Sequence, residues 1–356
     1  MIKVKFAGRE TPFYDDLNRE VDAYFASHNK KKTGDYRLYL KTFLIMGSMI
    51  SLYTILVFFT PATPIALVLC GLLGFTLALI GFNIMHDACH MSYSPNATVN
   101  EIIGYSMNFL GSNQFLWKLK HNRIHHTYTN IDGVDDDIIK MPILRLCKSQ
   151  PWKKAHRFQH IYGFFLYGVS SIFWVLITDL QKYFSRDISG TPIKEIPFRE
   201  HVIFWLTKVF YFSVYIAIPI WMLGFGKFII GYLVMNFVFG LVLSIVFQLA
   251  HAVDVTHFED GWHHDLNIED EWAVHQVKTT ADFAPRSHIA NWLLGGLNFQ
   301  VVHHLFPNIS HVHYREIQPI VERVCARHNV RYNVFNTFPK AVASHVRYIY
   351  NLGQAA

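Results

Sequence analysis

The chain has 356 residues, of which 51% are hydrophobic and 16% are charged, and its net charge is +6. Soluble domains carry about 25% charged residues, so this composition argues against a soluble globular protein, and we expect no nucleic-acid partner. It predicts an integral, multi-pass membrane protein. The first 40 residues are polar and mixed in charge, so internal spans rather than a signal peptide are expected to direct insertion.

Residues 42–85 contain no Asp, Glu, Lys, Arg or His, and the stretch Pro61-Ala-Thr-Pro64 interrupts them near the middle. One membrane span needs about 20 residues. The segment therefore predicts a hairpin of two spans, 42–60 and 64–85. A second charge-poor region predicts another hairpin, with spans 203–224 and 228–250 joined by a very short connection.

Two further apolar segments, 101–117 and 161–178, are expected to be interfacial helices that lie on the membrane. Basic residues near the span ends mark the cytoplasmic side, and here they fall in the N-terminal region and in the polar segments 86–200 and 251–356. The predicted fold is a single all-α domain over 1–356, with four transmembrane helices in two hairpins under a cytosolic helical cap.

Histidines gather where the apolar segments end. The spacings His-x3-His, His-x3-His-His and His-His recur in three clusters, and one more histidine ends the fourth span. Residues i and i+4 of a helix share one face, and neutral imidazole suits iron, zinc or copper. Zinc takes three or four protein ligands, so eight imidazoles indicate two metal ions, and iron fits oxygen chemistry best. The candidate ligands are His86, His90, His121, His125, His126, His251, His303 and His304.

A shared metal site also constrains the topology. Two histidine clusters follow the second span, and the others follow the fourth span. An even number of crossings must separate them if all ligands lie on one side. Segment 161–178 is therefore expected not to span.

Other polar residues near these motifs are candidates for supporting roles. Asp87, Asp132 and His275 are candidates for hydrogen bonds that orient the ligands, and the acidic run 135–137 could fix the second cluster or cap a helix. Trp117 is either a wall of a substrate tunnel or part of an interfacial aromatic belt. The remaining candidates bind a substrate phosphate or form a positive cytoplasmic surface: Arg145, Lys148, Lys153 and Lys154. No metal role is expected for His257, His263 and His264.

At these residues the chain resembles the integral-membrane fatty acid desaturases. HDACH (86–90), HNRIHH (121–126) and QVVHH (300–304) match the three histidine boxes of that family, and HHLFP (303–307) resembles its front-end or linoleoyl-CoA desaturase-like branch. The resemblance covers residues 40–335. It implies a di-iron enzyme that uses dioxygen to insert a cis double bond into an acyl chain carried by CoA, acyl carrier protein or a glycerolipid.

The resemblance also implies details of the site and its partners. Gln300 stands where other branches have a further histidine, and it could ligate directly, act through water or only form a hydrogen bond. No His-Pro-Gly-Gly haem motif of a fused cytochrome b5 domain occurs, so electrons are expected from a separate ferredoxin or cytochrome b5. A basic patch at Lys153, Lys154 and Arg157 is the predicted docking site, and the predicted location is a bacterial plasma membrane.

Two alternatives remain open at this stage. A membrane di-iron hydroxylase of lipids or alkanes would also have three histidine boxes, although the sequence of the third box favours a desaturase. A metal transporter would need polar ligands near the middle of the bilayer, whereas these histidines lie beyond the ends of the spans.

Overall fold

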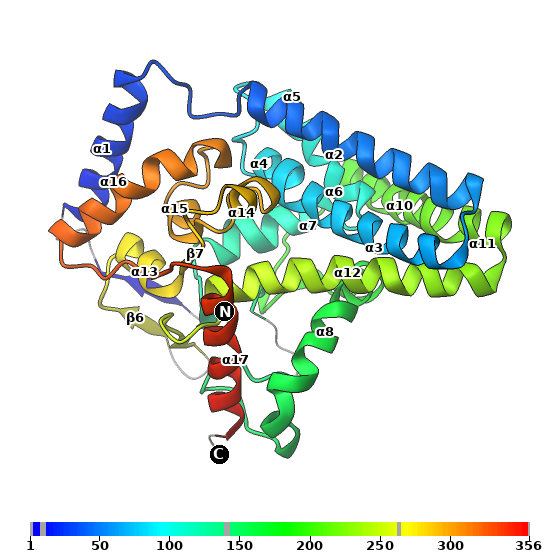
Figure 1. The fold of residues 1–356 in the computed structure, drawn as a ribbon. Coiled ribbons are helices and arrows are strands. Elements are labelled where there is room, and N and C mark those ends of the chain that lie inside the picture. The colour runs from blue at the N-terminus through cyan, green and yellow to red at the C-terminus, as the bar shows by residue number, and fades with distance from the viewer. Residues whose placement is uncertain (1–2, 8–11, 139–142, 262–264, 355–356) are drawn as a thin grey trace.

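The computed structural model describes residues 3–7, 12–138, 143–261 and 265–354, and most of them are helical. Long helices run side by side in one half of the molecule, and shorter helices form a cap at the other (Figure 1). Five stretches within the described residues are long and apolar enough to cross a membrane: Tyr36–Phe59, Thr63–Cys89, Lys154–Ser185, Phe198–Leu223 and Phe225–His251.

Four of these stretches correspond to the predicted spans. The first is α2 (Tyr36–Thr54) with a π-helical turn at Ile55–Phe59, and the second is α3 (Thr63–Ile80), a π-helical turn at Gly81–Met85 and α4 (His86–Cys89). The third is α10 (Phe198–Phe212), a π-helical turn at Ser213–Ala217 and α11 (Ile218–Leu223), and the fourth is the uninterrupted α12 (Phe225–His251). Local sequence sets the turns: Pro64 lies in the first turn of α3, and Gly224, at φ 77°, separates α11 from α12.

The fifth stretch contains the segment that was expected to lie at the interface. It consists of a 3-10 turn at Lys154–Phe158, α8 (Gln159–Phe173), a π-helical turn at Trp174–Thr178 and α9 (Asp179–Ser185). Figure 1 shows α8 steeply inclined to α12, whereas α2 and α3 run along it. By length and composition the chain thus has five candidate spans, and the predicted count of four remains a prediction.

The segment 101–117, expected as one interfacial helix, is instead broken into α5 (Ala97–Gly104), α6 (Ser106–Phe109) and α7 (Gln114–Lys118). Gly111 interrupts it with a φ of 92°, a conformation that costs other residues energy. Asn113 then caps α7 by accepting a hydrogen bond from the Leu116 amide. Sequence hydrophobicity does not report such a break, so the pattern predicted one continuous helix.

Small residues let the long helices approach α12 closely. A Cβ atom on Gly74 of α3 would lie 2.1 Å from the Met235 carbonyl oxygen, and one on Gly240 of α12 would lie 2.7 Å from the carbonyls of Tyr167 and Gly168 in α8. Such close backbone approach is typical of helices that pack within membranes. Helix α12 is therefore held between α3 and α8, and this contact fixes where its C-terminal histidine lies.

The cap consists of shorter elements around its own apolar core. Its remaining helices are α1 (Phe13–Ser27), a π-helical segment at Leu119–His125, α13 (Trp272–Thr279), α14 (His288–Leu293), α15 (Gln300–Leu305), a 3-10 turn at His311–His313, α16 (Tyr314–Arg327) and α17 (Phe338–Gln354). Buried residues of α1, α13, α15 and α16, such as Leu17, Val277, Val302 and Val321, form one cluster. The third histidine motif, on α15, is thus held by the core of the cap.

Very short paired strands connect segments of the cap. Because of these strands the fold is mostly helical rather than the all-α fold that was predicted. Within the described part of the chain each strand has two or three residues, and the strands form four two-stranded pairs. Three pairs are parallel: β1 (Val4–Phe6) with β6 (Leu266–Ile268), β2 (Ile131–Asp132) with β5 (Glu259–Asp260), and β7 (Asp282–Phe283) with β8 (Val334–Phe335). The antiparallel pair is β3 (Asp187–Ile188) with β4 (Thr191–Pro192).

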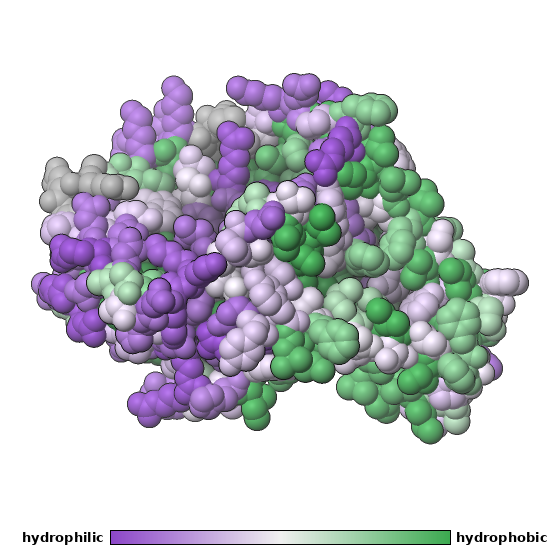
Figure 2. Space-filling model, turned by 90° about the horizontal axis from the view of Figure 1, so that it is seen from above, coloured by the Kyte–Doolittle hydropathy of each residue, from purple (hydrophilic) through white to green (hydrophobic). Residues whose placement is uncertain are grey.

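The surface divides as the helices do. Figure 2 shows hydrophobic side chains over the long helices and hydrophilic ones over the cap. Large apolar side chains are exposed along the long helices, among them Phe43, Phe59, Phe165, Leu206 and Trp221. An apolar surface of this extent suits contact with lipid rather than water, which agrees with the predicted membrane protein.

Candidate metal centre

The histidines lie at or near helix ends that converge beneath the cap. His86 begins α4 at the end of the second long helix, and His251 is the last residue of α12. Two π-helical segments are involved: one directly precedes His86, and the other carries His121 and His125. π-Helical turns are rare and are frequent at functional sites. The local backbone at both motifs is thus distorted where the side chains must converge.

The eight predicted histidines form one buried cluster, here called the histidine cluster. The ligand nitrogens of His86, His90, His121 and His303 lie within 4.8 Å of one another, and so do those of His125, His251 and His304. We call these sets the first and second histidine groups. His126 lies between them, because it forms a third set with His303 and His304.

The donor atoms of the cluster fit the bound metal that the motifs imply. Buried ring nitrogens without a hydrogen-bond partner among the described residues include Nε2 of His90, His125, His303 and His304. Unpaired buried polar atoms are costly, and a metal ion would satisfy several of them at once. Two neighbouring sets of imidazoles, connected through His126, suit two ions of a metal such as iron.

Two carboxylates position the rings of the second histidine motif. Asp137 accepts a hydrogen bond from Nδ1 of His121 at 2.8 Å, and Asp135 accepts one from Nδ1 of His125 at 2.9 Å. Both rings therefore turn Nε2 toward the cluster. Carboxylates in this position fix the tautomer of a ligating histidine and increase its basicity.

The third motif is positioned by neutral partners. Nδ1 of His303 lies 3.0 Å from the Tyr314 hydroxyl, and Nδ1 of His304 lies 2.9 Å from Oε1 of Gln276. Sequence reasoning missed Tyr314 and Gln276. They come from α16 and α13, which the fold brings to α15, and no local pattern connects them with the motif.

Burial keeps most of the rings neutral. It lowers the pKa of His90, His126, His303 and His304 well below the ordinary value for histidine. His125 differs: burial lowers the pKa of its ring too, but the carboxylates of Asp135 and Asp137 together outweigh burial and raise that pKa. Neutral imidazole is the form that binds a metal.

The predicted supporting residues make their hydrogen bonds with groups other than the eight histidines. Asp87 pairs with Nδ1 of His311 at 2.9 Å and accepts a hydrogen bond from Ser310. Asp132 accepts one from the Ser149 hydroxyl, and Nε2 of His275 bonds to the Thr129 carbonyl. The carboxylates that contact histidines of the cluster are instead Asp135 and Asp137. Both belong to the acidic run that was expected to fix the second motif or cap a helix.

Gln300 and Trp117 both border the cluster. Nε2 of Gln300 lies 3.1 Å from Nε2 of His251, and its Oε1 is buried without a hydrogen-bond partner among the described residues. Trp117 is buried and stacks on His121 with ring centres 4.4 Å apart. That position suits a wall of the reaction chamber better than an exposed aromatic belt.

The predicted phosphate-binding residues differ in burial and in the partners they already have. The buried Arg145 guanidinium donates hydrogen bonds to the carbonyls of Lys148, Gln150 and Leu352, so these donors are already used inside the fold. Lys148, Lys153 and Lys154 are exposed. His257 is exposed and pairs with Glu259, whereas His263 and His264 lie outside the described residues.

Comparison with known proteins supports the assignment made from the motifs. A model of the fatty acid desaturase family matches residues 60–336. The chain is 37% identical to the sn-1 linoleoyl-lipid 6-desaturase of Arthrospira platensis, over 98% of this chain and 94% of that protein. It is 36% identical to the protein of the same name from Synechocystis sp., over 99% of each chain.

A more distant relative has the same type of name. The acyl-lipid (8-3)-desaturase of Physcomitrium patens is 33% identical over 96% of this chain and 72% of its own length. The predicted desaturase is therefore confirmed in preference to the hydroxylase and transporter alternatives. The chain belongs to the fatty acid desaturase family, and it is an enzyme that desaturates fatty acyl chains.

Proposed function

We propose that the enzyme inserts a cis double bond into the acyl chain of a membrane glycerolipid, at position 6 of a linoleoyl chain, with dioxygen as oxidant and two iron ions as cofactor. Two similar proteins named linoleoyl-lipid 6-desaturases, which match nearly the whole chain, support the substrate. The observation that carries the di-iron proposal is the pair of histidine groups, whose ring nitrogens converge in a buried chamber.

The proposed reaction balances with one dioxygen per double bond. The substrate gives two protons and two electrons, as two hydrogen atoms from adjacent methylenes, and a separate donor gives two more electrons, with two protons from solvent, so that two waters form. Bound iron would supply the activation of dioxygen. The side chains of this chain have other tasks: the histidines hold the ions, Asp135 and Asp137 orient their rings, and Trp117 helps to keep water out.

The cytoplasmic location of the site is part of the proposal. His126 and His251 both belong to the cluster, so an even number of membrane crossings must separate them. Phe198–Leu223 and Phe225–His251 supply two crossings, and a third full crossing by Lys154–Ser185 would place the two histidines on opposite sides. This parity supports four spans, with Lys154–Ser185 inclined at the interface. Basic residues beside the spans support a cytoplasmic site in a bacterial plasma membrane.

A separate ferredoxin or cytochrome b5 is proposed as the electron donor, docked on Lys153, Lys154 and Arg157. All three are exposed, and the Arg157 guanidinium lies 5.3 Å from the ring centre of Trp152. Both donors are generally acidic proteins, so opposite charges would steer their encounter. Charge reversal at the three positions should slow reduction of the enzyme by the donor without changing its iron content. Unchanged reduction would exclude this surface.

Metal and lipid analysis of the same preparations tests the central proposal. Detergent-purified wild type should contain about two irons per chain, the number that two imidazole groups indicate, and cells that express it should accumulate lipids with a double bond at position 6. His303→Ala should lose iron and the new lipids, whereas the matched control His257→Ala should retain both. Hydroxylated lipids would indicate the hydroxylase chemistry instead, and one zinc per chain with unchanged lipids would refute the di-iron site.

A further inference from the structure

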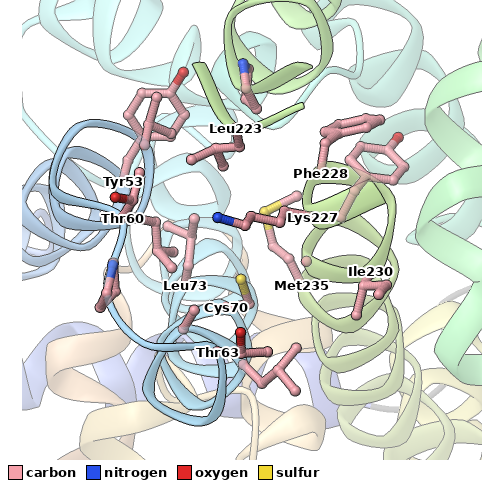
Figure 3. Close-up of a pocket in the computed structure, with 18 of the residues that line it drawn as sticks. Tyr53, Thr60, Thr63, Cys70, Leu73, Leu223, Lys227, Phe228, Ile230 and Met235 are labelled. Carbon is pink, nitrogen blue, oxygen red and sulfur yellow. The ribbon is translucent and has the colours of Figure 1, made fainter. Parts of the chain in front are cut away.

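An apolar cavity lies at the end of the long helices where the two hairpins turn (Figure 3). We call it the hairpin cavity; its volume is about 320 Å³. Its floor is buried and apolar, and its mouth is formed by exposed residues. The residues that define it include Leu56, Thr60, Cys70, Leu73, Lys227 and Met235.

The hairpin cavity is separate from the histidine cluster. Lys227 in its wall and His251 in the cluster are both on α12, 24 residues apart. At 1.5 Å per residue the helix carries them about 36 Å apart, whereas the hydrocarbon core of a bilayer is about 30 Å thick. An acyl chain fills one leaflet, about half of that thickness. A chain that reacts at the histidines therefore cannot reach this cavity, which lies at the opposite membrane surface.

Lys227 gives the cavity a single cationic group. It is the only charged residue in segments 42–85 and 209–250. In Figure 3 its side chain extends into the space between Leu73 and Met235, with Thr60 nearby. Among the residues that the structure describes, no carboxylate lies within ion-pair distance of its ammonium group. A lysine at a helix end often only extends to the aqueous interface, but this one points across an apolar hollow.

The backbone around Lys227 adds to the positive character. Lys227 lies in the first turn of the 27-residue helix α12, whose N-terminal end carries a partial positive charge. A Cβ atom on neighbouring Gly226 would meet nothing within 4 Å, so the backbone here is open to a ligand. An anionic group above the first turn could thus contact both the ammonium group and free amides.

We propose that the hairpin cavity binds one phosphate-bearing membrane lipid, taken from the leaflet opposite the histidine cluster. The phosphate would lie beside Lys227 at the first turn of α12, and an acyl chain would cover Leu56, Leu73 and Met235. The volume falls within the roughly 300–1,000 Å³ of small-molecule sites, which are mostly apolar with a few placed polar groups. The site uses none of the residues proposed to act in desaturation.

Native mass spectrometry of the full-length protein in detergent, titrated with phosphatidylglycerol, tests the proposal without using the catalytic reaction. Wild type should retain one tightly bound lipid in addition to any lipid that occupies the proposed substrate site at the histidine cluster. Lys227→Gln should bind it about tenfold more weakly, as expected for the loss of a charged hydrogen-bond partner. Lys227→Arg should restore binding, and the matched control Lys340→Gln, at an exposed position on α17, should bind as wild type does.

Three results would overturn the proposal. Equal binding by Lys227→Gln, at an unchanged melting temperature, would mean that the lysine only extends to the interface. Equally tight binding of diacylglycerol, which has no phosphate, would reduce the cavity to an apolar groove. Tighter binding of oleate would identify a carboxylate as the preferred anion. Because each result is a binding measurement, none of them bears on the desaturase reaction.

Discussion

The two histidine groups differ in their donors although they share one buried chamber. The first group consists of four imidazoles from three motifs, His86, His90, His121 and His303. The second has three, His125, His251 and His304, and beside His251 lies the Gln300 amide. An amide oxygen is a weaker ligand than imidazole for such a metal. If each group holds one of the two proposed irons, the second group should therefore hold its ion less tightly than the first.

The carboxylate partners reduce this difference. Burial lowers the pKa of His121 to about 4 despite its bond to Asp137, whereas the carboxylates of Asp135 and Asp137 together raise the pKa of His125 above its ordinary value. The Asp135 side chain is fully buried, and its Oδ2 also accepts a hydrogen bond from the Asn130 amide. A more basic ring is a better donor to a metal. The second group has fewer imidazoles, but one of them is strengthened by a fixed carboxylate.

Removing one ligand from each group should have the largest effect. His90→Ala and His251→Ala should each reduce iron from about two per chain to about one and lower desaturation more than about 100-fold, because losing a ligand costs more than the roughly 10–100-fold loss from an outer partner. Metal analysis and lipid mass spectrometry of the purified variants and their host cells measure both effects. Loss of both irons from either variant would show that the groups fill together, which would contradict their separate description.

The carboxylates should matter next. Asp135→Asn and Asp137→Asn should each weaken iron binding by about 10–100-fold, as partners of ligating histidines do. Asp135→Asn should be the more severe, because the pKa of His125 is raised overall whereas burial still lowers that of His121 despite Asp137. The rate of iron loss to a chelator measures this. Asp136→Asn is the matched control, since Asp136 contacts Lys182 and Ser189. A reversed order would show that ring basicity does not decide retention.

Sequence predicted which histidines come together better than it predicted their hydrogen-bond partners, for a physical reason. The spacing of His86 and His90 or of His121 and His125 is a local helical property that sequence records directly. The bonds from Asp135 and Asp137 depend on how residues 127–137 fold back, and those from Gln276 and Tyr314 depend on packing between distant helices. The acidic run was the available signal for the first pair. Asp87 was a misleading one, because it follows His86 but pairs with His311.

For the fold, too, sequence predicted the local features but not those that depend on packing. Uncharged length predicted both hairpins, because crossing a bilayer requires it. It could not settle Lys154–Ser185, whose composition suits either a span or an inclined interfacial helix. The break at Gly111 depends on a left-handed backbone conformation and on packing against Tyr211, and neither changes the hydrophobic pattern.

Tyr314→Phe should have a smaller effect than the carboxylate variants. It removes a neutral hydrogen bond of 3.0 Å from Nδ1 of His303, and such a bond contributes about 1 kcal/mol, or about fivefold in affinity. Because His303 belongs to the first group and also contacts His126, iron should be lost faster mainly from the first group. The rate of iron loss to a chelator, measured for Tyr314→Phe combined with His90→Ala or with His251→Ala, shows which histidine group is affected. An effect confined to the His90→Ala background would contradict this assignment.

Gln300→His should have the smallest effect and tests the comparison most directly. It would place a fourth imidazole beside His251 and make the donors of the second group resemble those of the first. Iron should then leave the second group a few-fold more slowly, whereas Gln300→Ala should retain it no better than wild type. Chelator kinetics in the His90→Ala background isolate the second group. If Gln300→His retains iron no longer than wild type, the Gln300 amide does not limit iron binding by the second group. The weaker binding would then be due to His251, because its Nδ1 has no hydrogen-bond partner among the described residues to orient the ring.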